Sequence, residues 1–169
     1  MPAFSYSVTT QLPRGRVWSL LTEITNWSKF SDMYSDLHWD GTPWAEGSAI
    51  VGQLNYPIVV SGRYVIKKCD PPTLIRYLSQ TRQAGFATET TIVLEQLVEG
   101  TMIRADAIIV GSPEMPGGGS EFLRRLTTRW FDEFAKFCDN QNSRYTDSNP
   151  HAESRQRPHR KVAGGNSAD

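Results

Sequence analysis

The sequence contains few residues that bind metals or form disulfides. Its 169 residues include 3 histidines and 2 cysteines, Cys69 and Cys138. The cysteines are far apart and have no metal-type spacing, so we expect free thiols in a reducing cytoplasm. No cluster of metal ligands and no Cys-His motif for an iron-sulfur centre is present. We therefore expect neither a metal nor another cofactor.

The sequence also lacks a charge of one sign and a long apolar run. It has 18 Lys and Arg against 18 Asp and Glu, so the formal net charge is zero. Nucleic-acid binding through phosphate neutralisation would favour a basic surplus. The chain has no such surplus, so we do not expect it to bind nucleic acid. No apolar run reaches the length of a membrane-spanning helix. The segment 1–6 has no basic stretch followed by an apolar one, which excludes a typical secretory signal.

Aromatic residues, by contrast, are plentiful. The chain has 5 Trp, 6 Tyr and 7 Phe, and 38% of its residues are hydrophobic. That is enough for one core, and the length fits a single domain. Large aromatic side chains are also well suited to lining a pocket.

The first third of the chain predicts one strand and two short helices. Residues 4–9 alternate apolar and polar side chains, which indicates a half-buried strand. Pro13 fits a first helical turn, and apolar residues follow at helical spacing through Ile24. Asn26 can cap a second short helix that runs through Phe30.

From Leu37 the hydrophobic period changes to two, which predicts six further strands. Asp70-Pro71-Pro72 is a turn signal, and Glu99-Gly100 predicts a hairpin. Gly62 lies inside a long strand, where glycine commonly marks a bulge or a bend. The six strands are expected at about 36–40, 48–54, 58–68, 74–82, 86–97 and 102–110.

The end of the chain predicts one long helix and a tail. Ser120 is a suitable N-cap, and a wide aromatic stripe continues from there to about Cys138. Residues 140–169 have no apolar periodicity, so we expect a domain at 1–139 and a disordered tail at 140–169.

This order of elements predicts an α+β fold. Strands joined by tight turns pair in an antiparallel sheet of about seven strands, and only the last helix is long enough to cover it. On the final strand Ile103, Ala105 and Ala107 share a face that we expect to point inward. Two alanines there leave a gap between sheet and helix, which suggests a cavity.

The sequence resembles the START-like superfamily, also called SRPBCC. The resemblance covers about residues 3–139, and it rests on the order and spacing of several weak motifs. These are Leu12-Pro13, Val17-Trp18, Leu20-Leu21, Asn26-Trp27 with Phe30, Gly47, Asp70-Pro71-Pro72, Tyr77, Glu99-Gly100-Thr101 and the helix through Trp130 and Phe134.

The resemblance implies a helix-grip fold, in which a curved seven-stranded sheet grips the C-terminal helix around a hydrophobic tunnel. Similar proteins bind lipids, sterols, polyketides or quinones, and some are polyketide cyclases or dehydratases. Because one fold supports many functions, the resemblance does not decide between binding and catalysis.

Several residues have both a chemical and a plain interpretation. His38 could be a general acid or base, but period two places it opposite Leu37 and Trp39, as on a surface. Arg104 and Asp106 could pair at a ligand, or on the solvent face if the alanines between them point inward. The glycines at 117–119 suit a hinge at the cavity mouth, and the basic segment 155–161 suits a solvated tail.

The leading hypothesis is a cytoplasmic binder or carrier of a hydrophobic small molecule, such as a lipid, polyketide, or other aromatic or isoprenoid compound. The alternatives are a polyketide cyclase, aromatase or dehydratase, and a protein-interaction module. Tyr64 and Tyr77 are expected either to give polar contacts or only to pack. The residues expected to line the cavity are Tyr64, Tyr77, Phe86, Thr88, Thr90, Ile103, Ala105, Ala107, Leu123, Thr127 and Trp130.

Overall fold

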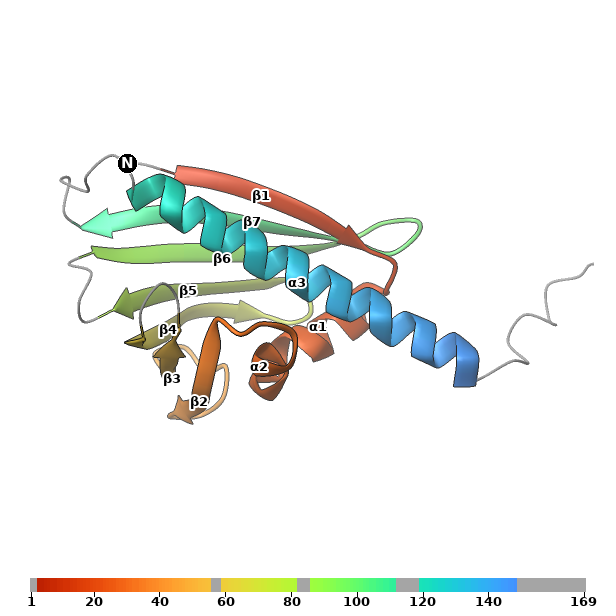
Figure 1. The fold of residues 1–169 in the computed structure, drawn as a ribbon, viewed down its shortest axis with the longest axis horizontal. Helices are drawn as coiled ribbons and strands as arrows, with labels where there is room; N and C mark the ends of the chain where they lie inside the picture. Colours follow the sequence, from red (N-terminus) through yellow and green to blue (C-terminus); the bar gives the residue numbers. More distant parts are fainter. Residues whose placement is uncertain (1–2, 56–58, 82–85, 112–118, 149–169) are drawn as a thin grey trace, which may run out of the picture.

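The computed structural model describes residues 3–55, 59–81, 86–111 and 119–148. Within these ranges the chain forms an α+β fold with one sheet of seven strands and one long helix, as predicted (Figure 1). The helices are α1 (Arg14–Thr22), the 3-10 turn η1 (Ile24–Asn26), α2 (Trp27–Phe30) and α3 (Gly119–Ser148). The strands are β1 (Ala3–Thr10), β2 (Tyr34–Asp40), β3 (Ala49–Leu54), β4 (Val60–Asp70), β5 (Leu74–Thr81), β6 (Phe86–Gln96) and β7 (Thr101–Gly111).

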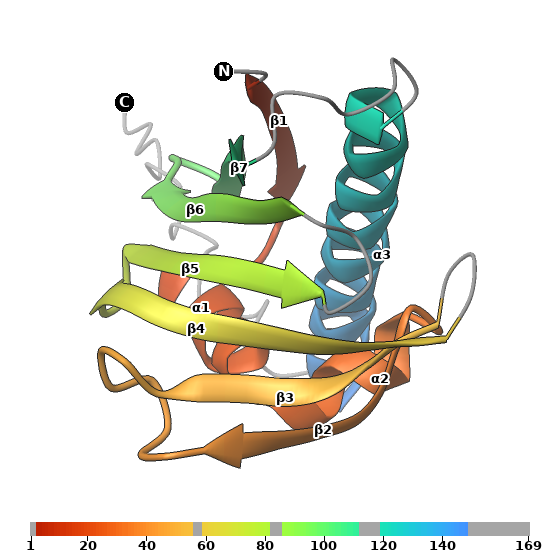
Figure 2. The same cartoon turned by 90° about the vertical axis from the view of Figure 1, so that its left-hand side faces the viewer.

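All neighbouring strands are antiparallel, in the order β1-β7-β6-β5-β4-β3-β2. Short turns join β4 to β5 and β6 to β7, as expected for hairpins, whereas residues 41–48 form a longer connection between β2 and β3. The first strand leaves this meander and pairs with the last one, so that Tyr6 lies opposite Ala105. The two ends of the strand sequence therefore meet, while β2 and β1 form the edges of a curved sheet (Figure 2).

The long helix α3 lies across the concave face of the sheet, and the short helices support only part of it. In Figure 1 α2 lies beside the middle of α3, and α1 lies toward its C-terminal half; Figure 2 shows both on the same side of the sheet as α3. The ring of Phe30 on α2 lies 5.2 Å from that of Phe134 and 5.4 Å from those of Phe137 and Trp130. The middle of α3, from Trp130 to Phe137, is thus held between the sheet and α2.

Polar contacts hold the same helix to the neighbouring elements. The Tyr6 hydroxyl donates a hydrogen bond to the Asp132 carboxylate. Further along α3, Asp139 Oδ1 accepts from Thr10 Oγ1 at 2.6 Å and from the backbone N of Gln11 at 3.0 Å. These contacts fix the height and rotation of α3 relative to β1. No helix in the described ranges is long and apolar enough to cross a membrane.

The helix continues beyond the end predicted near Cys138 and is described as far as Ser148. Hydrophobic periodicity ends near Cys138, but no glycine or proline interrupts the sequence until Pro150. The prediction of a tail from residue 140 was wrong for 140–148. The division of the chain at 139 otherwise stays a prediction, because residues 149–169 lie outside the described ranges.

Two local predictions also need correction. Asn26 precedes α2 as expected, but its side chain does not cap the helix; Nδ2 donates to Leu20 O at 3.1 Å instead. The irregularity in β4 lies between Ile66 and Lys68 rather than at Gly62. A Cβ at Gly62 would lie 3.1 Å from the hydroxyl oxygen of Tyr64, so this glycine makes room for the tyrosine ring.

The hairpin glycine Gly100 is required by its surroundings. Its φ is +95°, and a Cβ there would lie 2.0 Å from the carbonyl oxygen of Thr10. We expect Gly100→Ala to lower the free energy of unfolding by at least about 2 kcal/mol, from the left-handed backbone and the clash. Urea denaturation followed by circular dichroism measures the change.

Gly15→Ala on α1 is the matched control, since a Cβ at Gly15 has no atom within 4 Å. Gly15 lies in the first turn of α1, where alanine should be neutral or raise the free energy of unfolding by up to about 1 kcal/mol. Equal effects of the two substitutions would contradict the assigned contact between the hairpin and β1.

Candidate functional site

The inward side chains of the sheet differ between its two ends. At the end near the β6–β7 hairpin they are large and aliphatic. One row across the sheet joins Ile75, Ile92 and Ala105, and the next joins Leu94 with Ile103. All five are buried and belong to the hydrophobic core together with Phe131 and Phe134 of α3. This end is solidly packed.

At the other end several inward side chains are small or carry hydroxyl groups, although Ile66 and Ile109 are also buried there. Across the sheet, Tyr64 lies opposite Ser79, Ser79 opposite Thr88, and Thr88 opposite Ile109. In the adjacent row Tyr77 lies opposite Thr90, which lies opposite Ala107. Thr88, Thr90, Ala107 and Ile109 are buried, yet Ala107 and Ile109 are not part of the packed core cluster. Here the sheet presents a polar floor of small side chains.

Three tyrosines connect this floor to α3. The ring centroids are 6.3 Å apart for Trp130 and Tyr34, 5.8 Å for Tyr34 and Tyr64, and 6.0 Å for Tyr64 and Tyr77. All three pairs are edge-to-face, the favoured geometry for aromatic contacts. We call Tyr34, Tyr64, Tyr77 and Thr90 the hydroxyl row, because their hydroxyl groups follow one another from β2 to β6.

Burial holds the phenols of the hydroxyl row in the protonated form. It raises the pKa of Tyr77 to about 12, while hydrogen bonding with Thr90 opposes the rise. It also raises the pKa of Tyr64, with a further contribution from Tyr77 and an opposing one from hydrogen bonding with Tyr34. Burial and the two neighbouring phenols raise the pKa of Tyr34 well above its usual range. At neutral pH the row therefore consists of uncharged donors and acceptors.

Tyr34 and Tyr77 are deep but still accessible. Burial is the largest cause of their raised pKa values, yet both side chains keep an intermediate accessible surface, unlike Tyr64. On α3, Leu123 and Thr127 are two turns and one turn before the buried Trp130, respectively, and are likewise half-buried. Accessible surface on inward-facing side chains is typical of groups that border a space inside a protein.

Trp130 adds an unpaired donor to this region. Its side chain is only 5% exposed, and no acceptor among the described residues bonds to its indole Nε1. Burying an N–H group without an acceptor costs about 1–3 kcal/mol, so such groups are rare in folded proteins. The neighbouring Trp27 has a satisfied indole, which donates to Leu21 O at 2.9 Å.

The structure brings most of the predicted cavity residues to the concave face. Tyr64, Thr88, Thr90, Ile103, Ala105, Ala107 and Trp130 are buried there, and Tyr77, Leu123 and Thr127 are half-buried. The side chain of Phe86 lies outside the described part of the chain. Tyr64, Ile103, Ala105 and Trp130 belong to the core cluster and Tyr77 packs against it, whereas Ala107 and Leu123 are not part of it. Whether they contact a ligand stays a prediction.

Sequence analysis missed Tyr34 because β2 is irregular. The strand was predicted from about residue 36, but it begins at Tyr34 and has a register shift between Ser35 and His38. Asp36 within this shift has a φ of 54°, which breaks the alternation of side chains. The sequence gives only a weak local sign of this irregularity, which is Asp36 directly after Tyr34 and Ser35.

The other candidate residues lie outside the concave face. His38 is exposed, as its plain interpretation predicted, with Nδ1 3.0 Å from Asp36 O. Arg104 Nε and Asp106 Oδ2 form an ion pair of 3.1 Å on the partly exposed outer face, which also agrees with the plain interpretation. No group of potential metal ligands occurs in the described ranges. The glycine loop before α3 and the basic segment 155–161 are not described, apart from Gly119.

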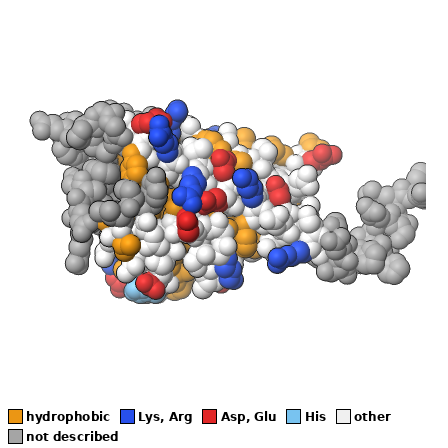
Figure 3. Space-filling model, viewed as in Figure 1, with side chains coloured by type: hydrophobic (Ala, Val, Ile, Leu, Met, Phe, Trp, Pro, Cys, Tyr) orange, Lys and Arg blue, Asp and Glu red, His pale blue; other side chains and the backbone are white. Residues whose placement is uncertain are grey.

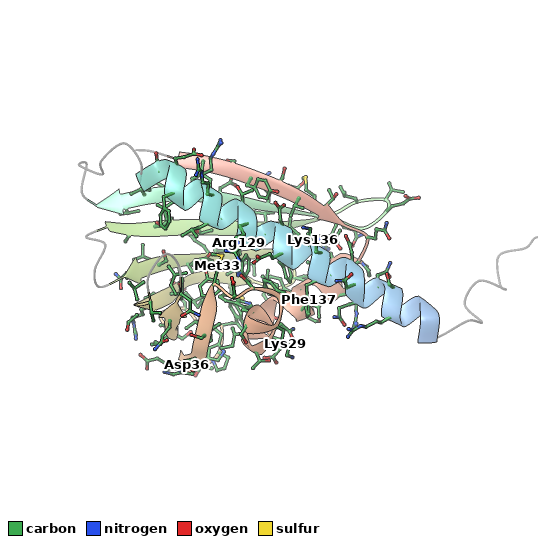
Figure 4. All side chains as sticks on the ribbon, viewed as in Figure 1. Lys29, Met33, Asp36, Arg129, Lys136 and Phe137 are labelled. Carbon is green, nitrogen blue, oxygen red and sulfur yellow. The ribbon has the colours of Figure 1, made fainter. Side chains whose placement is uncertain are left out.

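An open groove of about 600 Å³ lies outside the concave face, between β1 and the outer side of α3. Acidic and basic side chains alternate along this side of α3 (Figure 3). Arg129 lies where α3 passes Met33 (Figure 4), and it donates to Asp32 at 2.6 Å and to Glu133 at 2.8 Å. The charges in this groove are mostly paired, so it contrasts with the uncharged interior.

Sequence comparisons leave the chain unplaced: no family model and no curated protein matches it. The fold, however, is found in many solved structures. Ara h 8.0201 superposes with a TM-score of 0.69 at 12% identity, over 81% of this chain and 97% of its own. For BexL, described as a di-domain ARO/CYC of the BE-7585A biosynthetic pathway, the TM-score is 0.63 at 15% identity, over 91% and 50%.

DynU16, from the dynemicin biosynthetic locus, has a TM-score of 0.62 at 14% identity, over 80% of this chain. This chain spans 46% of DynU16 and half of BexL, so it corresponds in size to one part of each. At such low sequence identity, the structural likeness establishes the fold but no activity. The seven-stranded sheet, the two short helices after β1 and the long final helix match the predicted architecture. The chain has the helix-grip fold of START-like proteins.

Proposed function

We propose that this protein binds or carries a hydrophobic small molecule in the cytoplasm, in a space between the hydroxyl row and the N-terminal half of α3. One observation carries the proposal. Tyr34 and Tyr77 keep accessible surface, although burial is the largest cause of their raised pKa values. Leu123 and Thr127 face the same region from α3 and are also half-buried. Compact packing would have covered all four side chains.

Side-chain size supports the same location. Ala107, Ser79 and Thr88 occupy inward positions where the other end of the sheet has Ile75, Ile92 and Leu94. The short helices α1 and α2 lie beside the middle and the C-terminal half of α3 (Figure 1). Phe4 is the cross-strand neighbour of Ala107 and, like Leu123, does not pack against the core cluster. The apolar walls and few polar groups resemble those of small-molecule sites in general.

A cyclase or aromatase is the alternative, and the ARO/CYC description of BexL favours it. Such an enzyme needs a group that transfers protons near neutral pH. Among the described inward side chains the titratable groups are tyrosines, Cys69 and Cys138. Burial raises the pKa of both thiols, that of Cys138 to about 12. These groups can donate hydrogen bonds but cannot act as bases at pH 7. The described interior therefore supports binding more strongly than catalysis.

Filling the space tests the proposal. We expect Ala107→Trp to abolish binding of an apolar fluorescent probe while the free energy of unfolding changes by less than about 1 kcal/mol, because the new ring gains contacts without displacing neighbours. Ala105→Trp, one row away in the packed core, should instead lower the free energy of unfolding by more than about 3 kcal/mol through overpacking. Probe titration and urea denaturation measure both effects. Severe destabilisation by both variants, with no probe uptake by the wild type, would contradict the proposed space.

The raised pKa of Tyr77 predicts how stability depends on pH. Because its pKa is about 12 in the folded state and 10.0 in the reference state, folding is favoured below pH 10 and loses this contribution as pH rises toward 12. The loss attributable to Tyr77 is at most roughly 2–3 kcal/mol. Urea denaturation at pH 8 to 12 should show a shallower decline for Tyr77→Phe than for the wild type. Parallel declines would show that Tyr77 is not held in its neutral form by burial.

A further inference from the structure

We propose that the molecule bound at the hydroxyl row is uncharged there and presents an oxygen acceptor, such as a carbonyl or a phenolic oxygen, to Trp130 and the tyrosines. Compounds whose buried end is a carboxylate or an ammonium group are excluded. The inference rests on the proposed function and adds the class of ligand to it.

The described strands offer no counter-charge to an ionised ligand. In the described parts of β3 to β7 the inward positions are uncharged: they are apolar, glycine, tyrosine, serine or threonine, apart from Gln96 at the hairpin end of β6. A charged group moved from water into such surroundings loses its hydration and gains no ion pair. The charged side chains of α3 line the outer groove instead, where Arg129 is already paired with Asp32 and Glu133. The interior therefore selects against charge.

The second argument is the balance of donors and acceptors. Tyr34 hydrogen-bonds with Tyr64, and Tyr77 with Thr90, so that the row is internally paired. The ring of Trp130 lies next to that of Tyr34, and its buried Nε1–H group finds no acceptor among the described residues. An indole N–H can only donate, so an acceptor is what its environment lacks. A ligand oxygen would supply it, whereas a pure hydrocarbon would leave the group unpaired.

The third argument concerns geometry. Trp130 contacts Tyr34 edge-on, with ring centroids 6.3 Å apart, and Tyr34 contacts Tyr64. A flat ring system bound against Leu123 and Ala107 would thus meet aromatic edges on one side and small aliphatic groups on the other. Ring compounds with a neutral oxygen fit these surroundings, because rings pack on aromatic edges and the oxygen accepts the free N–H.

Three naphthalenes of nearly the same shape test the inference. They are 2-acetylnaphthalene, which has a neutral carbonyl, 2-naphthoate, which has a carboxylate, and 2-isopropenylnaphthalene, which has no oxygen. Calorimetric titration of the full chain at pH 7.5 gives the three dissociation constants. We expect the ketone to bind about tenfold more tightly than the hydrocarbon, as for one good hydrogen bond, and more than about tenfold more tightly than the carboxylate.

Two variants identify the groups responsible. Trp130→Phe removes the N–H group and Tyr77→Phe removes a hydroxyl, while each keeps an aromatic ring. At least one of the two variants should bind the ketone less than about threefold more tightly than the hydrocarbon, while its affinity for the hydrocarbon stays unchanged. Trp39→Phe is the matched control, because it also removes an indole N–H and keeps a ring, and Trp39 packs on Trp44 outside the hydroxyl row. It should leave the preference unchanged.

The outcomes separate this inference from the proposed function. If the ketone and the hydrocarbon bind equally, or the carboxylate binds as tightly as the ketone, the space exists and the inference about its ligand is wrong. A preference that persists in both variants would also overturn it. If none of the three compounds binds to the wild type, the proposed function fails and the inference fails with it.

Discussion

The broad aromatic face of α3 has to be buried, and the concave sheet is the only surface in the described chain large enough to bury it. Phe131, Phe134 and Cys138 are almost completely buried in this contact. Burial of apolar surface contributes about 25 cal/mol per Å², so this helix contributes much of the stability of the domain. The curved sheet, the pairing of β1 with β7 and the position of the short helices all serve this one contact. Polar bonds from Asp132 and Asp139 to β1 then fix how the helix lies.

Because the helix is straight and the sheet is curved, the two cannot be equally close along their whole length. The C-terminal half of α3 is supported by α2 and by large aliphatic residues of the sheet. The N-terminal half faces Thr90, Ala107 and the tyrosines, which are too small or too polar to form the same kind of layer. The difference between the two halves is the structural basis of the proposed binding site. The packed C-terminal half of α3 can hold the N-terminal half in place, even if side chains do not fill the space between that N-terminal half and the sheet.

Much of the fold could be predicted because local patterns determine it. Period-two alternation located the strands, and burial of Ile103, Ala105, Ala107 and Ile109 confirms the predicted inward face of β7. The helical stripe located α3, although its end was wrong because propensity alone carries the helix past Cys138. Where backbone geometry departs from the repeat, as at Asp36 in β2, the pattern failed and Tyr34 was overlooked.

The site was harder to predict, because it depends on contacts between distant residues. Tyr77 and Thr90 are cross-strand partners, and only the register of β5 on β6 brings them together. The role of Gly62, which makes room for the Tyr64 ring, likewise depends on a side-chain direction rather than on a strand bend. The sequence showed that tyrosines and threonines face inward. It could not show that they form one row, or that the Trp130 N–H group is buried without an acceptor among the described residues.

The central claim is that an enclosed space separates the N-terminal half of α3 from the sheet. A crystal structure determined under xenon pressure tests it most directly, because xenon occupies apolar space inside proteins and scatters strongly. The account predicts xenon density, or density for a retained ligand, between Ala107 and Leu123. Direct packing of Leu123 and Thr127 onto Thr90 and Ala107, with no density between them, would contradict it.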